Sequence, residues 1–163
     1  MSLAIHLRQS LELPAFIVDA FLQDLSDDEL FVRPSAGMNH IAWQLGHLIV
    51  SENSHINLVT DGLMPLLPEG FARQHCSETT AIDDPASFRT KHQYLALMAE
   101  QRLATRGQLA GLSDDSLKLP SPESIRYLGP TVACVFSGTA THWMMHAGQW
   151  SVVRRRLGRP LLF

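Results

Sequence analysis

Apolar residues recur at helical spacing along four long segments of this 163-residue chain, and proline, glycine and polar residues gather between them. The segments cover about residues 3–25, 39–60, 84–110 and 131–157. No stretch shows the strict alternation of apolar and polar residues that is typical of a half-buried strand. The pattern therefore predicts an all-α protein in which four long helices, joined by two long connections, pack as a four-helix bundle.

Residues suited to helix ends mark the expected boundaries. Asn39 is a favourable N-cap for the second segment, and Asp84 followed by Pro85 is a favourable start for the third. Gly158 is expected to end the fourth segment, whereas Pro14 is expected to kink the first.

The connections at residues 61–83 and 112–130 contain several prolines and are long for a helical bundle. A connection of this length is usually functional or carries the chain across the bundle. Because loops on a rigid scaffold commonly determine specificity, we expect both to form part of a pocket, although the first could equally be a plain crossover.

Composition narrows the range of functions. Hydrophobic residues make up 45% of the chain, charged residues make up 18%, and the net charge is −3. These values are typical of a single globular domain that spans residues 1–163, and they give no sign of a nucleic-acid surface. Two distant cysteines exclude a disulfide framework and a cysteine-rich zinc site, and the start of the chain has no recognisable secretion signal. We therefore expect a cytoplasmic protein.

One segment shares a feature with membrane helices. Residues 131–153 contain no charged side chain, and three arginines follow them, as they often follow a membrane span. The segment nevertheless contains two histidines, a glutamine and several hydroxyl-bearing residues, which suit a fully buried helix of a bundle. We favour the buried helix and expect no association with a membrane.

The candidate chemistry begins in the same segment, at "THWMMHAGQW". His142 and His146 are four residues apart and so leave one face of a helix, at a spacing that allows two imidazoles to bind one metal ion. The spacing alone has a high false-positive rate, and Trp143 stands where a zinc protease would have its catalytic glutamate. The alternative is a set of core histidines that bond to hydroxyls, carbonyls or water.

A third ligand should come from a neighbouring helix, and His47 is the best candidate because it too is flanked by apolar residues. Gly148 would let another helix approach closely, and Gln149 could be a hydrogen-bond partner of a ligand. His40 is expected to be such a partner or exposed, and His75 and Cys76 are weaker candidates for ligands. Solvent exposure is expected for four side chains: His6, Glu52, His55 and His92.

Two stretches, "LSDDELFVRPSAGMNHIAWQLGHLIVSEN" and "HWMMHAGQWSVVRRRLGRP", resemble the DinB-like (YfiT-like) superfamily. The resemblance lies in the motifs N-x-I-x-W-x-x-x-H and H-x-x-x-H-x-G-Q, in this order. It implies a four-helix bundle with up-down-down-up topology, often a homodimer. It also implies a divalent metal ion, nickel or zinc, held by His47, His142 and His146.

Three neutral imidazoles leave coordination positions open for water or substrate, as in a catalytic site. Relatives in the family include thiol-dependent transferases and isomerases and proposed hydrolases. The resemblance therefore favours an enzyme that activates a thiolate or water on a small-molecule substrate, with a low-molecular-weight thiol as a possible partner. The alternative is a non-enzymatic, stress-associated binding or dimerisation bundle whose metal site is empty or vestigial.

Overall fold

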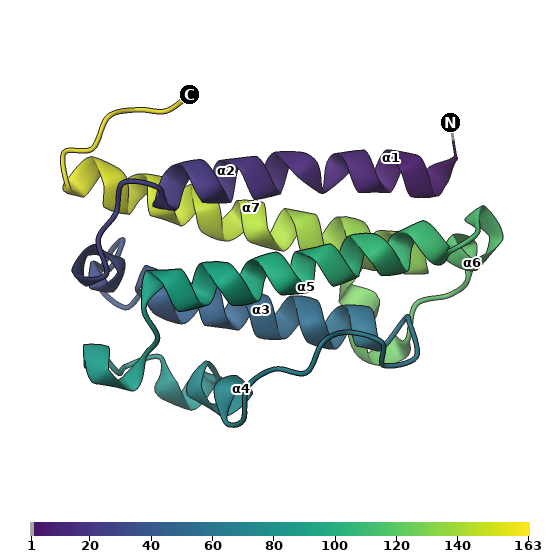
Figure 1. The fold of residues 1–163 in the computed structure, drawn as a ribbon, viewed down its shortest axis with the longest axis horizontal. Helices are drawn as coiled ribbons and strands as arrows, with labels where there is room; N and C mark the ends of the chain where they lie inside the picture. Colours follow the sequence, from purple (N-terminus) through teal and green to yellow (C-terminus); the bar gives the residue numbers. More distant parts are fainter. Residues whose placement is uncertain (1) are drawn as a thin grey trace.

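The computed structural model describes residues 2–163, and within this range the chain forms helices and connections without a strand. The first long segment consists of α1 (Leu3–Ser10) and α2 (Glu12–Leu22), which continue almost in line (Figure 1). The other three are α3 (Ile41–Asn57), α5 (Lys91–Gly111) and α7 (Val132–Arg156). The predicted four-helix bundle is confirmed.

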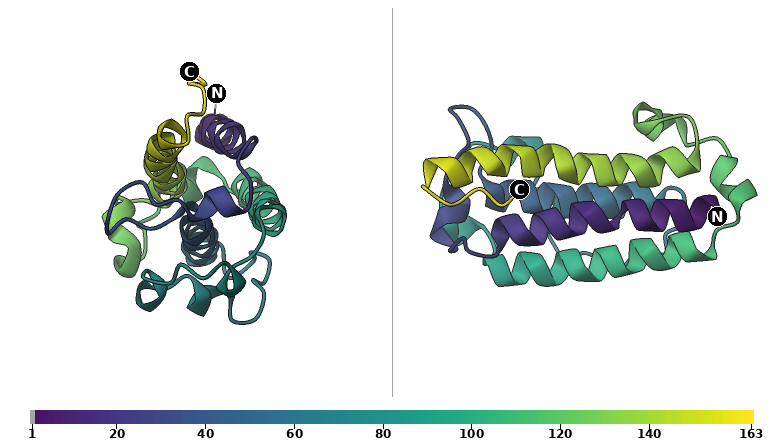
Figure 2. Two further views of the ribbon diagram at one scale, coloured as in Figure 1. Left: turned by 90° about the vertical axis from the view of Figure 1, so that its left-hand side faces the viewer. Right: turned by 90° about the horizontal axis from the view of Figure 1, so that it is seen from above.

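The directions of the helices follow the predicted up-down-down-up topology. In Figure 1, α1, α2 and α7 run towards one end of the bundle, and α3 and α5 run towards the other. Seen end-on in Figure 2, α7 lies beside the α1–α2 segment and α3 lies below them. α3 packs against both α5 and α7, which places the two histidine-bearing helices side by side and antiparallel.

The first long segment is interrupted as the sequence predicts. α1 ends at Ser10 and α2 begins at Glu12, so the interruption falls at Leu11, three residues before Pro14. Proline has no amide hydrogen to donate to the carbonyl four residues earlier, and its ring crowds that carbonyl, which here belongs to Ser10. At the other end of the chain, Gly158 adopts φ +68° directly after the C-cap of α7, as expected.

Two predicted helix starts are wrong. Asp84 caps only a single 3-10 turn, η3 (Pro85–Ser87), because Phe88 then takes an extended conformation and packs against the ring of His40. The helix α5 begins after Thr90, which forms a capping box with Gln93.

The N-cap of α3 is His40 and not Asn39. The Trp43 amide donates to Nδ1 of His40 at 3.1 Å, so the ring carries its proton on Nε2, which donates to the carbonyl of Ile82 at 3.0 Å. The ring is fully buried between Phe31 and Phe88. His40 is therefore a structural residue, neither exposed nor part of a ligand site.

The connection after α3 is a crossover. It includes α4 (Phe71–Gln74) and η2 (Ser77–Thr79), runs back along α3 and delivers the chain to the start of α5 at the opposite end (Figure 1). The indole of Trp43 donates to Thr79 Oγ1 at 2.9 Å, and the ring of His75 lies directly on Gly46. The crossover therefore covers one side of α3.

Glu52 lies inside the bundle, so its expected exposure is wrong. Only 3% of the residue is accessible, and its carboxylate accepts hydrogen bonds from Thr105 Oγ1 and Trp143 Nε1, each at 2.7 Å. The guanidinium of Arg102 lies over the Trp143 ring, 4.4 Å from its centroid. This network directs Trp143 towards α5, away from the cavity that His142 lines.

No helix among residues 2–163 combines the length and apolar character that a membrane span needs. The uncharged segment at residues 131–153 forms most of α7, which packs against α1, α2 and α3. The absence of charge on this segment therefore reflects burial within the bundle.

Gly46 and Gly148 provide a test of the packing. A Cβ on Gly46 would lie 2.1 Å from Cδ2 of His75, whereas a Cβ on Gly148 would have nothing within 4 Å, so the expected close approach at Gly148 is wrong. We predict that Gly46→Ala lowers the free energy of unfolding by about 2 kcal/mol through overpacking. Urea denaturation followed by circular dichroism measures this. Gly148→Ala is the control and should be neutral or slightly stabilising, by up to about 1 kcal/mol; equal effects of the two changes would contradict the packing.

Candidate metal centre

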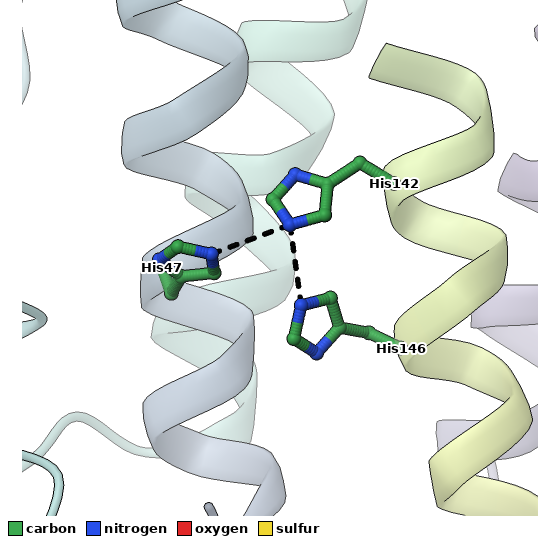
Figure 3. Close-up of side chains that lie close together, drawn as sticks. All are labelled: His47, His142 and His146. Atoms are coloured by element: carbon green, nitrogen blue, oxygen red, sulfur yellow. Dashed lines mark hydrogen bonds between the residues drawn. The ribbon is translucent and has the colours of Figure 1, made fainter. Parts of the chain in front are cut away.

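Three histidine side chains from two helices converge inside the bundle (Figure 3). His47 comes from the middle of α3, and His142 and His146 come from successive turns of α7. Nε2 of His142 lies 3.3 Å from Nε2 of His47 and 3.2 Å from Nε2 of His146. Within residues 2–163, this is the one cluster of at least three His, Cys, Asp or Glu side chains that could hold a metal ion.

The separation of these nitrogens fits a first-row metal ion. Two imidazole nitrogens bound to a tetrahedral ion at about 2.0–2.1 Å lie about 3.3–3.4 Å apart. The distances of 3.3 and 3.2 Å match this value before any movement of the side chains. A set of three imidazoles suits zinc and nickel, among other divalent ions.

A glutamine fixes the proton of His146. Nδ1 of His146 lies 2.8 Å from Oε1 of Gln44, a carbonyl oxygen that only accepts, so Nδ1 is the donor. Trp150 Nε1, which only donates, also bonds to Oε1 at 2.8 Å, and this contact settles the orientation of the amide. In the neutral ring Nε2 is therefore left with its lone pair, directed at His142.

Gln149, predicted as a hydrogen-bond partner of a ligand, bonds to Gln44, which in turn bonds to His146. Its Oε1 accepts a hydrogen bond of 3.1 Å from Nε2 of Gln44, whose amide also donates to the carbonyl of Asn39. Gln44 is the residue that sequence reasoning missed. The available signal was a glutamine within the apolar run "IAWQLG", where a buried amide requires several partners.

All three rings are held in the form that binds metals. Burial, with a smaller contribution from neighbouring imidazoles, lowers the pKa of His142 to about 4 and that of His146 to about 3. Burial also lowers the pKa of His47, whose ring stacks on Trp43 with 5.0 Å between centroids. At neutral pH the three imidazoles are therefore uncharged, which is the state a metal ligand requires.

A cavity of about 580 Å³ lies against the cluster, and His47 and His142 form part of its wall. α3 adds Ser51 and His55, and α7 adds Cys134, Thr141 and Met145, among others. Among residues 2–163, no lysine, arginine, aspartate or glutamate lines it. The site therefore combines possible ligands with an uncharged, largely apolar space for a small molecule.

One of the two long connections contributes to this cavity. Residues 112–130 contain α6 (Asp114–Lys118) and η4 (Glu123–Leu128), and η4 places Tyr127 and Leu128 in the wall. The segment packs against α7 and appears in light green in Figure 2. Residues 61–83 contribute nothing to this cavity, so the expectation is correct for the second connection and wrong for the first.

The remaining histidines lie outside the cluster. His6 and His92 are exposed, as expected. His55 is only 9% exposed, which contradicts its expected place on the surface. His75 is buried, donating from Nδ1 to the carbonyl of Phe71 and accepting from the Tyr94 hydroxyl at 2.7 Å, so it is a packing residue and Cys76 beside it joins no cluster.

Comparisons with known proteins identify the family and the fold. The family model of the DinB superfamily matches residues 17–150, a stretch that contains all three histidines. The chain belongs to the DinB superfamily. No curated relative matches it.

Two solved structures share the fold of this DinB superfamily protein. A conserved protein from Enterococcus faecalis superposes with a TM-score of 0.71 at 15% identity, covering 98% of this chain and 99% of the other. YfiT from Bacillus subtilis, described as a probable metal-dependent hydrolase with an unusual four-helix bundle topology, gives a TM-score of 0.65 at 19% identity. That match covers 96% of this chain and 89% of YfiT.

The buried histidines should make stability depend on pH. Burial lowers the pKa of His75 from 6.5 to about 4, so below pH 6.5 the unfolded chain takes up a proton that the folded chain does not. The stability that neutral His75 contributes is complete above pH 6.5 and is lost as the pH falls towards 4. The loss amounts to about 2 kcal/mol at pH 5. Urea denaturation of chelator-treated protein between pH 7.5 and 5 measures the slope. His75→Gln should flatten it by this amount, and an unchanged slope would contradict the assignment.

Proposed function

We propose that this DinB superfamily protein is a metal-dependent enzyme whose divalent ion, nickel or zinc, is held by His47, His142 and His146. The observation that carries the proposal is the convergence of three neutral imidazoles beside an uncharged cavity. When bound, such an ion would supply a nucleophile near neutral pH by lowering the pKa of a thiol or a water. The fold shared with YfiT, described as a probable metal-dependent hydrolase, supports the same class of chemistry.

The chain itself holds the ligands in place before any ion binds. Gln44 fixes the ring of His146 in the tautomer that turns Nε2 towards the other ligands. Trp43, whose indole is anchored on Thr79 of the crossover, supports the ring of His47 by stacking. Such partners position ligands and raise their affinity for a metal ion.

Of the two nucleophiles, the cavity favours a thiol. No carboxylate lines it, and Glu52, the acidic residue closest in sequence to His47, is bonded to Trp143 and Thr105 elsewhere. A thiol loses its proton outright on coordination and needs no neighbouring base. Thiol S-transfer with a low-molecular-weight thiol is therefore the first proposal, and metal-dependent hydrolysis, which the likeness to YfiT favours, is the second.

Metal content tests the centre directly. His47→Ala, His142→Ala and His146→Ala should each lower the metal-to-protein ratio from about one to below about 0.2, because two imidazoles bind a divalent ion much more weakly than three. Elemental analysis of purified protein gives the ratio. His92→Ala removes an exposed histidine and should retain the ion; full occupancy in all three ligand variants would disprove the centre.

The same preparations separate an enzyme from a binding protein. Thiol transfer and ester hydrolysis are assayed on metal-loaded protein with and without a chelator. Activity that the chelator abolishes supports the proposal. A fully loaded protein that catalyses neither reaction would instead indicate a non-enzymatic binding bundle.

Gln44 offers a second test that leaves the ligands intact. Gln44→Leu should weaken metal binding about 10- to 100-fold, because His146 loses the acceptor that fixes its tautomer. Competition with a chromophoric chelator measures the affinity, and the thermal midpoint of the apoprotein checks the fold. Gln149→Leu removes a residue that accepts a hydrogen bond from Gln44 and should weaken metal binding several-fold less. Equal losses in the two variants would show that the effect is not specific to His146.

A further inference from the structure

A second polar group lies at the other end of the cavity. His47, Ser51 and His55 follow one another at four-residue intervals on α3, and all three line the cavity. At a rise of 1.5 Å per residue, His55 lies about 12 Å further along the helix axis than His47. Tyr127 of η4 lies opposite, at the rim, and is 75% exposed.

His55 and Tyr127 form a pair. Nε2 of His55 lies 2.9 Å from the hydroxyl oxygen of Tyr127, and Nδ1 of His55 is buried without a hydrogen-bond partner. Among the described residues, no hydrogen bond joins this pair to the three-histidine cluster, and no part of the proposed chemistry uses the pair. A buried histidine that is bonded only to an exposed tyrosine at a cavity mouth requires an explanation other than packing.

The unpartnered nitrogen indicates where the protons are. Burial lowers the pKa of His55, so its ring is neutral and carries one N–H. A proton on Nδ1 would leave a buried donor without an acceptor, which folded proteins rarely tolerate. With the proton on Nε2, His55 donates to the Tyr127 oxygen, and the hydroxyl hydrogen of Tyr127 is free to turn into the cavity.

We infer that Tyr127, positioned by His55, is a substrate-binding residue that donates a hydrogen bond to the far end of an elongated substrate. The inference rests on the proposed function, since the other end of that substrate is the thiol at the three-histidine centre. The acceptor is a neutral carbonyl or amide, because no cationic side chain lines the cavity to balance a carboxylate there. The substrate class is thus a thiol with an amide group about 10 Å from its sulfur and an apolar middle beside Leu128 and Met145.

Synthetic thiols can test this selectivity without knowledge of the natural substrate. The probes are ω-mercaptoalkanamides with about six to eight methylenes, a length that matches the helical rise from His47 to His55. Each is paired with the same thiol ending in an isopropyl group, which has the shape of the amide without its acceptor. Titration into cobalt-substituted protein, followed by the thiolate-to-metal absorption band, gives both dissociation constants.

In the wild-type protein the amide should bind about 3- to 10-fold more tightly than its isopropyl partner, the range expected of one hydrogen bond. Tyr127→Phe should abolish this preference while leaving the isopropyl thiol unaffected, which shows that the centre is intact. His55→Leu should reduce the preference, and His55→Gln, which retains an N–H donor, should restore part of it.

The outcomes separate the two proposals. If every thiol produces the absorption band but the amide has no advantage, or keeps its advantage in Tyr127→Phe, the role of Tyr127 is overturned and the metal centre stands. If cobalt binds and no thiol produces the band, thiol coordination itself fails, and the inference fails with it.

Discussion

Placing one buried and two half-buried imidazoles side by side in a helical bundle imposes a strict hydrogen-bonding requirement, which is met most clearly at the buried ring, His146. Each ring must be neutral. Its single proton must lie on the nitrogen that faces away from the cluster, so that the nitrogen facing the cluster keeps its lone pair. Gln44 meets this requirement for His146, and its own amide is satisfied by the main chain and by Gln149. The cluster is therefore positioned by α3 and α7 together, two antiparallel helices in direct contact.

One short stretch of α3 serves several neighbours at once. Trp43 reaches the crossover, Gln44 reaches α7, Gly46 receives the ring of His75, and His47 faces the cavity. Since these residues occupy successive faces of little more than one turn, the crossover on one side and the ligand helix on the other are held to a common register. These residues of α3 therefore position both the crossover and the helix that carries His142 and His146.

Sequence reasoning recovered the elements whose signals are local. The limits of α7 follow from Thr131 and Gly158, and the three converging histidines follow from helical spacing together with the family resemblance. It failed where the deciding contact is distant in sequence. Glu52 and His55 look like surface residues until Trp143 and Tyr127 are placed beside them, and Asp84 looks like the start of a helix until Phe88 docks near His40. A single sequence does not show which face of a helix a remote connection will cover.

The two long connections have different structural roles. The crossover is tied to the core, whereas η4 supplies a wall of the cavity yet provides none of the three histidines. Insertions or exchanges in residues 112–130 can therefore change the shape and polarity of the binding space without altering the ligand set. In such a bundle one surface segment can diversify and reshape the cavity, while the three histidines on α3 and α7 are kept.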